Sequence, residues 1–276
     1  MTAPSDLPTL YRSKKVYVWV EDEETRTYLN AAWEDPEIGL LVSGGHENIH
    51  AVVKSSRRDG FTHVFGFRDR DFGRSNRATW QNKETEVMTS AAFEVENLLL
   101  DSEAMAACDV NTSGKTAAQI TEELEKLAEV LPWWMSCRRA ITEIHDAVAG
   151  QFIGHPKRGG VKTQTEAEAA IFASPWWTAV LPAIGTSVDQ ASVEASLLRH
   201  HASYTAMLGS EEWRTHFSGK EVLRDVVTRI WTKRQSARLH IDFIQSIARA
   251  QRSSGRVPDE IRELRAALRA HGNLPP

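Results

Sequence analysis

Cysteine is scarce in this chain: Cys108 and Cys137 are the only two in 276 residues, and they stand far apart. Neither a disulfide framework nor a zinc site built from cysteine pairs is therefore expected. Also missing are an apolar run of about 18 residues, which a membrane-spanning helix needs, and the cationic and apolar blocks of a signal peptide at the N-terminus. We expect a cytoplasmic protein with no membrane partner.

An excess of positive charge is lacking as well. The chain has 33 Lys and Arg against 37 Asp and Glu, a net charge of -4. The net charge therefore does not indicate a histone-like protein that coats nucleic acid, or a cationic protein that binds membrane surfaces. Charged residues make up 25% and hydrophobic residues 41%, as in ordinary globular proteins, which excludes a disordered chain.

The first third of the chain alternates between two kinds of pattern. Short β-branched and aromatic runs at 15–20, 39–43 and 62–68 predict buried strands, and helical spacing of apolar residues at 23–33 and 47–58 predicts helices between them. Two shorter β-like runs follow at 77–80 and 86–89. Strands that alternate with helices over short links indicate a mostly parallel α/β sheet with right-handed crossovers.

Beyond residue 102 the pattern becomes helical, and no strand alternation returns. The ranges expected to be helices are 116–131, 134–151, 164–172, 188–208, 220–232 and 235–251. A chain of this length suggests two packed units. We therefore expect an α/β catalytic domain at 1–102 and an appended, mainly α-helical region at 103–276 that binds substrate, a second copy or a partner.

Acidic residues follow two of the predicted strands. Glu21 ends the first strand, and Asp69 and Asp71 follow the third. Ligand sites of parallel α/β sheets lie outside the carboxyl ends of the strands. Three carboxylates crowded there repel one another unless a cation, a basic partner or protonation compensates. Oxygen ligands without His or Cys favour Mg²⁺ over zinc.

This arrangement resembles the TOPRIM domain of topoisomerases, primases and OLD-family nucleases, whose signature is Glu after the first strand and Asp-x-Asp after the third. The segments 43–49, 67–72 and 95–99 resemble, more narrowly, the AriB-like TOPRIM nucleases found beside an ABC-type ATPase in the PARIS anti-phage systems. The resemblance implies a Rossmann-like sheet and a metal-dependent nuclease that acts as a toxic effector of defence. It departs at Asp22, where many TOPRIM domains have Gly, and a side chain there narrows the approach to the metal or adds a ligand.

The resemblance also implies roles for the acids. Asp69 and Asp71 would hold Mg²⁺, with Mn²⁺ as an alternative ion, and Glu21 would either complete the metal's ligands or act as a general acid or base. Glu96 is the candidate for an additional ligand, and Glu94 is the competing choice.

Other residues are candidates for binding the substrate. They are Gly44, Gly45, Arg68, Arg70, Arg74, Lys220 and Arg224. The two glycines either let backbone N–H groups approach phosphate or only form a tight turn. Lys220 and Arg224 belong to a basic stretch that is either a nucleic-acid track or a solvated helix face.

The expected partners are tRNA or another RNA, with DNA not excluded, the ABC-type ATPase and a second copy of the chain. Tryptophan pairs at 133–134 and 176–177 suit either a core or such an interface. One alternative is a phosphohydrolase of small esters with an aspartyl nucleophile, although Gly73 departs from that class. The other is a non-catalytic TOPRIM-like binding module, motivated by Asp22 and by the low net charge.

Overall fold

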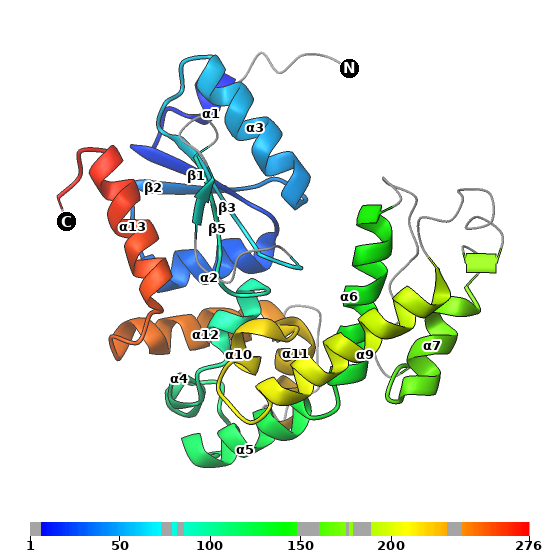
Figure 1. Ribbon diagram of the computed structural model, residues 1–276. Coiled ribbons are helices and arrows are strands. Elements are labelled where there is room, and N and C mark those ends of the chain that lie inside the picture. Colours follow the sequence, from blue (N-terminus) through cyan, green and yellow to red (C-terminus); the bar gives the residue numbers. More distant parts are fainter. Residues whose placement is uncertain are drawn as a thin grey trace. The chain divides into compact units, whose positions relative to one another are not determined.

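The computed structural model describes residues 7–72, 79–81, 86–147, 160–174, 177–178, 189–230 and 239–275. The chain forms two compact units, and its two ends belong to the same one. Unit 1 comprises residues 1–120 and 227–276, and unit 2 comprises residues 121–226. Figure 1 shows the sheet and its helices in unit 1 and the helices of unit 2.

Unit 1 is built on a five-stranded sheet in the order β2-β1-β3-β5-β4. Its strands are β1 (Val16–Val20), β2 (Ile38–Val42), β3 (Val64–Arg68), β4 (Thr79–Gln81) and β5 (Val87–Thr89). β2, β1, β3 and β5 are parallel, and only the edge strand β4 is antiparallel. The predicted strands are confirmed, and the fold is α/β with a small, mostly parallel sheet and a helical region.

Two crossover helices cover opposite faces of the sheet. The helix α2 (Glu23–Trp33) links β1 to β2, and α3 (His46–Arg58) links β2 to β3 in the opposite direction along the sheet. Right-handed crossovers in opposite directions place their helices on opposite faces. Close packing of α3 on β3 requires Gly66, because a Cβ there would lie 2.4 Å from Cγ2 of Ile49.

Helices from the end of the chain complete unit 1. The helix α12 (Leu239–Ser253) packs along α2, and α13 (Asp259–His271) contacts β1. The Trp33 indole of α2 donates to the carbonyl of Ile261 at 3.1 Å. The smaller helices α1 (Leu7–Leu10), η1 (Val95–Leu99) and α4 (Ser102–Ala107) also belong to this unit. The structure thus divides differently from the boundary expected at residue 102, because α12 and α13 pack with the elements of the sheet unit.

Unit 2 is helical. It contains α6 (Pro132–Ala147), α7 (Gln164–Phe172), α9 (Gln190–Met207) and α10 (Trp213–His216), while α5 (Ala117–Ala128) and α11 (Gly219–Ile230) cross its boundaries. Trp134 is buried and Trp133 stacks on His201, so this first tryptophan pair makes intramolecular contacts; Trp176 lies outside the described residues.

Both cysteines are buried and free, as the sequence indicated. No helix within the described ranges combines the length and the apolar character that crossing a membrane requires.

The packing of α12 and α13 on the sheet unit predicts how fragments behave. A fragment of residues 1–102 would expose the apolar face of α2, including Trp33, and we expect it to melt without cooperativity. A chain in which residues 1–120 are joined to residues 227–276 by a flexible linker should melt cooperatively. Near-ultraviolet circular dichroism during heating checks both, and cooperative melting of fragment 1–102 would contradict the expectation.

Candidate functional site

The predicted acids lie at the carboxyl end of two neighbouring strands. Glu21 directly follows β1 and Asp69 directly follows β3, and these strands pair in parallel with Trp19 opposite Gly66. Both acids thus lie just beyond the carboxyl ends of two paired strands, where they come together. Oε1 of Glu21 accepts a hydrogen bond from the backbone N–H of Asp69 at 3.1 Å.

Asp69 is the electrostatic centre of this acidic cluster. Its Oδ1 is buried, and no hydrogen bond reaches that atom from the residues described. Burial raises its pKa well above the ordinary value, and the negative charges of Glu21, Glu96 and Asp71 raise it further. Burial, followed by the charge of Asp71, raises the pKa of Glu21 to about 7. Burial and like charges thus both oppose ionisation of the cluster.

The loop after β3 holds its second aspartate in an uncommon backbone conformation. Asp71 has a φ of 49°, in the left-handed region that few residues other than glycine adopt. Its backbone N–H donates to the carbonyl of Phe93 at 2.9 Å, so a neighbouring segment holds this turn. Local strain of this kind is concentrated at functional sites.

Glu94 and Glu96 both lie near Asp69, since the charge of each raises the pKa of that aspartate, Glu96 more strongly. Glu94 is the N-cap of η1, where it forms a reciprocal capping box with Asn97. Glu96 is in the first turn of η1, and only 2% of the residue is exposed. Glu94 therefore has a local structural role, whereas burial of Glu96 beside Asp69 favours Glu96 as the additional ligand.

Asp22, where the resemblance implied either a narrower approach to the metal or a further ligand, has a structural role at the start of α2. It is the N-cap of α2, and its Oδ1 accepts hydrogen bonds from the backbone N–H and the hydroxyl of Thr25, at 2.9 and 2.8 Å. Its φ of -141° is extended backbone, which does not call for glycine. Its charge contributes only a minor part of the rise in the pKa of Glu21.

Gly44 and Gly45 lie at the same edge of the sheet. Their φ values of 78° and 151° suit glycine, and no atom lies within 4 Å of where a Cβ would stand. The N–H of Gly44 donates to the carbonyl of Glu21 at 3.0 Å, and Gly45 is the N-cap of α3. The pair thus forms a tight turn beside the acids and begins a helix whose N-terminus opens toward the same edge.

The predicted basic contacts are placed very differently. Arg68 lies beside the acids, because its charge lowers the pKa of Glu21, and its Nε donates to Thr89 Oγ1 at 2.9 Å. Arg70, which was also predicted to contact substrate, is buried, with 7% of the residue exposed. Arg74 lies outside the described residues.

Lys220 and Arg224 belong to the other unit, on α11. Arg224 is paired with Glu221 of the same helix and lies 3.9 Å from Asp225. This local pairing is typical of a solvated helix face. Both residues thus belong to the unit that does not contain the acidic cluster.

Sequence reasoning missed the segment that supports residues 69–71, which we call the acid loop. Residues 90–93, which we call the support loop, follow β5. Ser90 N–H donates to the carbonyl of Arg68 at 2.9 Å, and Ala92 and Phe93 accept from the N–H groups of Arg70 and Asp71 at 3.3 and 2.9 Å. The backbone of the acid loop is thus held on both sides of Asp69.

Glu260 of α13 in turn holds the support loop. Its carboxylate accepts from Ser90 Oγ at 2.7 Å and from the N–H of Ala91 at 2.8 Å. The hydroxyl of Ser90 also accepts from the N–H of Ala92 at 2.9 Å. A helix from the end of the chain therefore positions the turn that carries Asp71. The acidic residues at the start of α13 are visible in the sequence, but the sequence does not show that Glu260 contacts the support loop.

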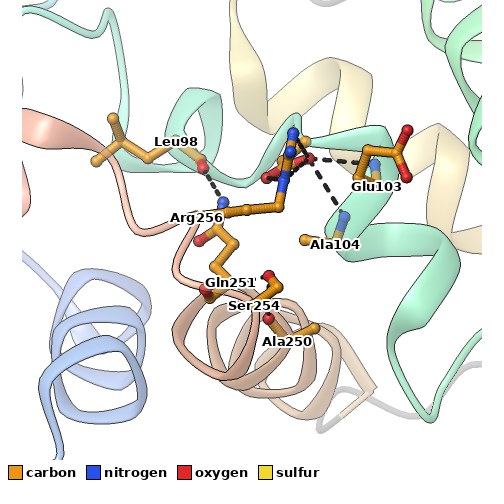
Figure 2. Close-up of polar contacts among 8 residues, drawn as sticks. Leu98, Glu103, Ala104, Ala250, Gln251, Ser254 and Arg256 are labelled. Carbon is orange, nitrogen blue, oxygen red and sulfur yellow. Dashed lines mark hydrogen bonds and ion pairs between the residues drawn. The ribbon is translucent and has the colours of Figure 1, made fainter.

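The next segment along the chain is anchored by α12 and its C-terminal turn (Figure 2). Gln251, which is buried, donates from its amide to the carbonyl of Leu98 at 2.7 Å. Arg256 forms a bidentate ion pair with Asp101, which also accepts from the N–H groups at the start of α4. These contacts fix η1, and with it Glu96, against the helices of the chain's end.

The chemistry of the cluster fits a hard divalent cation. In the parts of the chain described, no three Asp, Glu, His or Cys side chains already form a ready ligand group for a metal. The carboxylates would therefore have to turn toward one another to hold an ion. The donors are nonetheless all oxygens, and the buried Oδ1 of Asp69, which no hydrogen bond reaches from the described residues, suits a hard cation as a ligand.

Charge burial at Asp69 predicts a stabilising substitution. We expect Asp69→Asn to raise the melting temperature in EDTA at pH 7.5 by roughly 2–4 °C. The folded protein must either keep this carboxyl charged among other acids or hold a proton that the unfolded chain releases at this pH, and asparagine avoids both costs. Asp59→Asn is the matched control, since Asp59 ends α3 with 42% of its side chain exposed. Differential scanning fluorimetry measures the shift, and a lower melting temperature for Asp69→Asn would refute this account of the cluster.

The hydrogen bonds of Glu260 predict how the acid loop moves. Glu260→Gln keeps one oxygen acceptor but replaces the other with a donor, so the support loop loses a charge-assisted hydrogen bond. Amide exchange in residues 69–71 and 90–93 should accelerate about tenfold or more. Glu263→Gln, at an exposed position of the same helix, is the control. Hydrogen-exchange mass spectrometry measures these rates. Equal exchange rates in the two variants would show that Glu260 does not position the acid loop or the support loop.

Comparison with known proteins adds no family to this picture. No protein-family model matches the sequence, and no curated protein matches it. What the chain does must therefore be inferred from the acidic cluster and from the segments that hold it.

Proposed function

We propose that this protein is a Mg²⁺-dependent TOPRIM-type endonuclease that hydrolyses phosphodiester bonds. One observation carries the proposal. Glu21, Asp69 and Asp71 lie together at the carboxyl edge of two adjacent parallel strands, and the central carboxyl of Asp69 is buried among other acids. A cation bound there would compensate the mutual repulsion that makes this arrangement unfavourable.

The residues of the cluster would share the work of cleavage. Asp69 and Asp71 would hold the ion, and Glu96 would be the additional ligand. A magnesium ion bound there would supply positive charge that stabilises the phosphoryl oxygens during displacement. Glu21 either completes the ligands or exchanges a proton with the attacking or leaving oxygen, and its place at the end of β1 suits both roles.

Neighbouring groups would orient the nucleic acid. Arg68 lies close enough to the acids to lower the pKa of Glu21, and its guanidinium group suits contact with a phosphate. The turn at Gly44 and Gly45 leaves open space where side chains would otherwise stand, which lets a phosphate approach the backbone. These contacts recognise the backbone of a polymer and do not distinguish RNA from DNA.

The biological setting follows from the resemblance to AriB-like nucleases. In this proposal the protein is the toxic effector of an anti-phage system, an ABC-type ATPase partner controls it, and host tRNA is the substrate to test first. A homodimer is part of the same proposal.

One experiment tests the activity against its alternatives. The purified chain, alone and with its co-expressed ATPase partner, is incubated with tRNA, with plasmid DNA and with p-nitrophenyl phosphate, in Mg²⁺ or in EDTA. We expect Mg²⁺-dependent cleavage of a polymer that falls by more than roughly a hundredfold in Asp69→Asn, since loss of supporting residues alone costs a metal site about 10- to 100-fold. Glu21→Gln should lose cleavage as well, and Asp59→Asn should retain it.

Other outcomes decide against the proposal. Turnover of the small ester alone would identify a phosphohydrolase. If Mg²⁺ raises the melting temperature of the wild type but neither polymer is cut with the partner present, the cluster is a binding module. If Mg²⁺ does not change the melting temperature of the wild type, the prediction of a metal site is itself wrong.

A further inference from the structure

A second candidate site lies in unit 1, on the outer side of α13. It is a cavity of about 540 Å³ formed by the ends of α2 and α12, one face of α13 and the residues that follow it. Trp33, Val257 and Leu274 contribute apolar walls. The charged lining consists of arginines alone: Arg252, Arg262, Arg265 and Arg269. No carboxylate belongs to the lining of this cavity, whose residues are all described.

The sequence of α13 explains why the cavity exists. Ala266 and Ala270 are four residues apart and therefore lie on one face of the helix, where their small side chains leave a hollow. The arginines at 262, 265 and 269 surround that hollow. The opposite face carries Ile261, Leu264 and Leu268, all buried in the core. The helix is thus amphipathic, and its outward face is hollow and basic.

A buried aspartate holds two of the arginines in place. Only 1% of the Asp35 side chain is exposed, and it pairs with Arg265 at 3.0 Å and with Arg269. Burial by itself would raise the pKa of Asp35, but hydrogen bonds from Arg269, the Glu37 backbone and Arg265 lower it overall. One carboxylate between two guanidinium groups leaves this cluster with a net positive charge and fixes both groups beside the apolar wall.

The other two arginines have partners that are easily exchanged. Arg252 pairs with Glu34 and Arg262 with Asp259, whose side chains are 75% and 80% exposed. Ion pairs this exposed contribute little to stability. Both guanidinium groups can therefore exchange a surface carboxylate for an anion that enters the cavity.

We propose that this cavity binds a small nucleoside phosphate. Its volume is in the range of small-molecule sites, about 300–1,000 Å³. Guanidinium groups match phosphate oxygens in pairs of hydrogen bonds and also stack on planar rings, and the apolar walls suit a base. The site is separate from the acidic cluster and does not depend on nuclease activity.

Isothermal titration calorimetry on the full chain tests the proposal. The probes are ADP, AMP, adenosine and inorganic phosphate, all in EDTA so that a metal at the acidic cluster plays no part. We expect ADP and AMP to bind one per chain, and adenosine and phosphate to bind at least about tenfold more weakly than AMP, because each supplies only half of the contacts.

Three variants link the binding to the cavity. Ala266→Leu fills the hollow at an exposed helix position without removing an arginine. Arg262→Gln removes one phosphate contact. Each variant should weaken the binding of ADP at least about tenfold. Arg249→Gln makes the same charge change at an exposed position of α12 outside the cavity, and should bind ADP as the wild type does. Melting curves check that all three remain folded.

The proposal is overturned if no nucleotide binds at millimolar concentration, or if adenosine binds as tightly as AMP. It is equally overturned if ADP binding is unchanged in folded Ala266→Leu and Arg262→Gln. Binding of a glutamate-rich peptide in place of nucleotides would assign the cavity to a protein partner.

Discussion

Crowding of carboxylates around Asp69 is the constraint on which the rest of unit 1 depends. Two parallel strands end side by side, and each delivers an acid to the same edge of the sheet. Burial and mutual repulsion both oppose ionisation there. Such a cluster persists only if the surrounding backbone holds it, because the side chains themselves would move apart. Support of the acid loop is therefore as much a part of the site as the acids.

That support comes from the far end of the chain. Glu260 of α13 holds the support loop, and Gln251 of α12 holds η1. These contacts join residues about 150 or more positions apart in sequence. The outward face of the same helix α13 lines the arginine-rich cavity, and Arg262 of that lining is two positions from Glu260 in the sequence. The end of the chain thus both completes the acidic cluster and forms a site of its own.

Much of the sheet could be predicted from local pattern. The strands and crossover helices of the first third agree with the predicted ranges to within about two residues, because buried β-branched runs and helical spacing are properties of neighbouring residues. The convergence of Glu21, Asp69 and Asp71 was predicted from their places at the carboxyl ends of parallel strands. The role of Asp22 could not be predicted, because its side chain could reach either the acidic cluster or Thr25. Only the structure shows the hydrogen bond to Thr25 that caps α2.

The sequence by itself determined the α/β class, the parallel strands and the acids at their ends, since each depends on residue type and short spacing. Only the tertiary structure decided which helices complete the sheet unit, that Arg70 is buried, and that Glu96 lies beside Asp69. The physical reason is the same for all three. Burial and charge interactions are set by residues distant in sequence, and no local pattern records which distant residue will supply the contact.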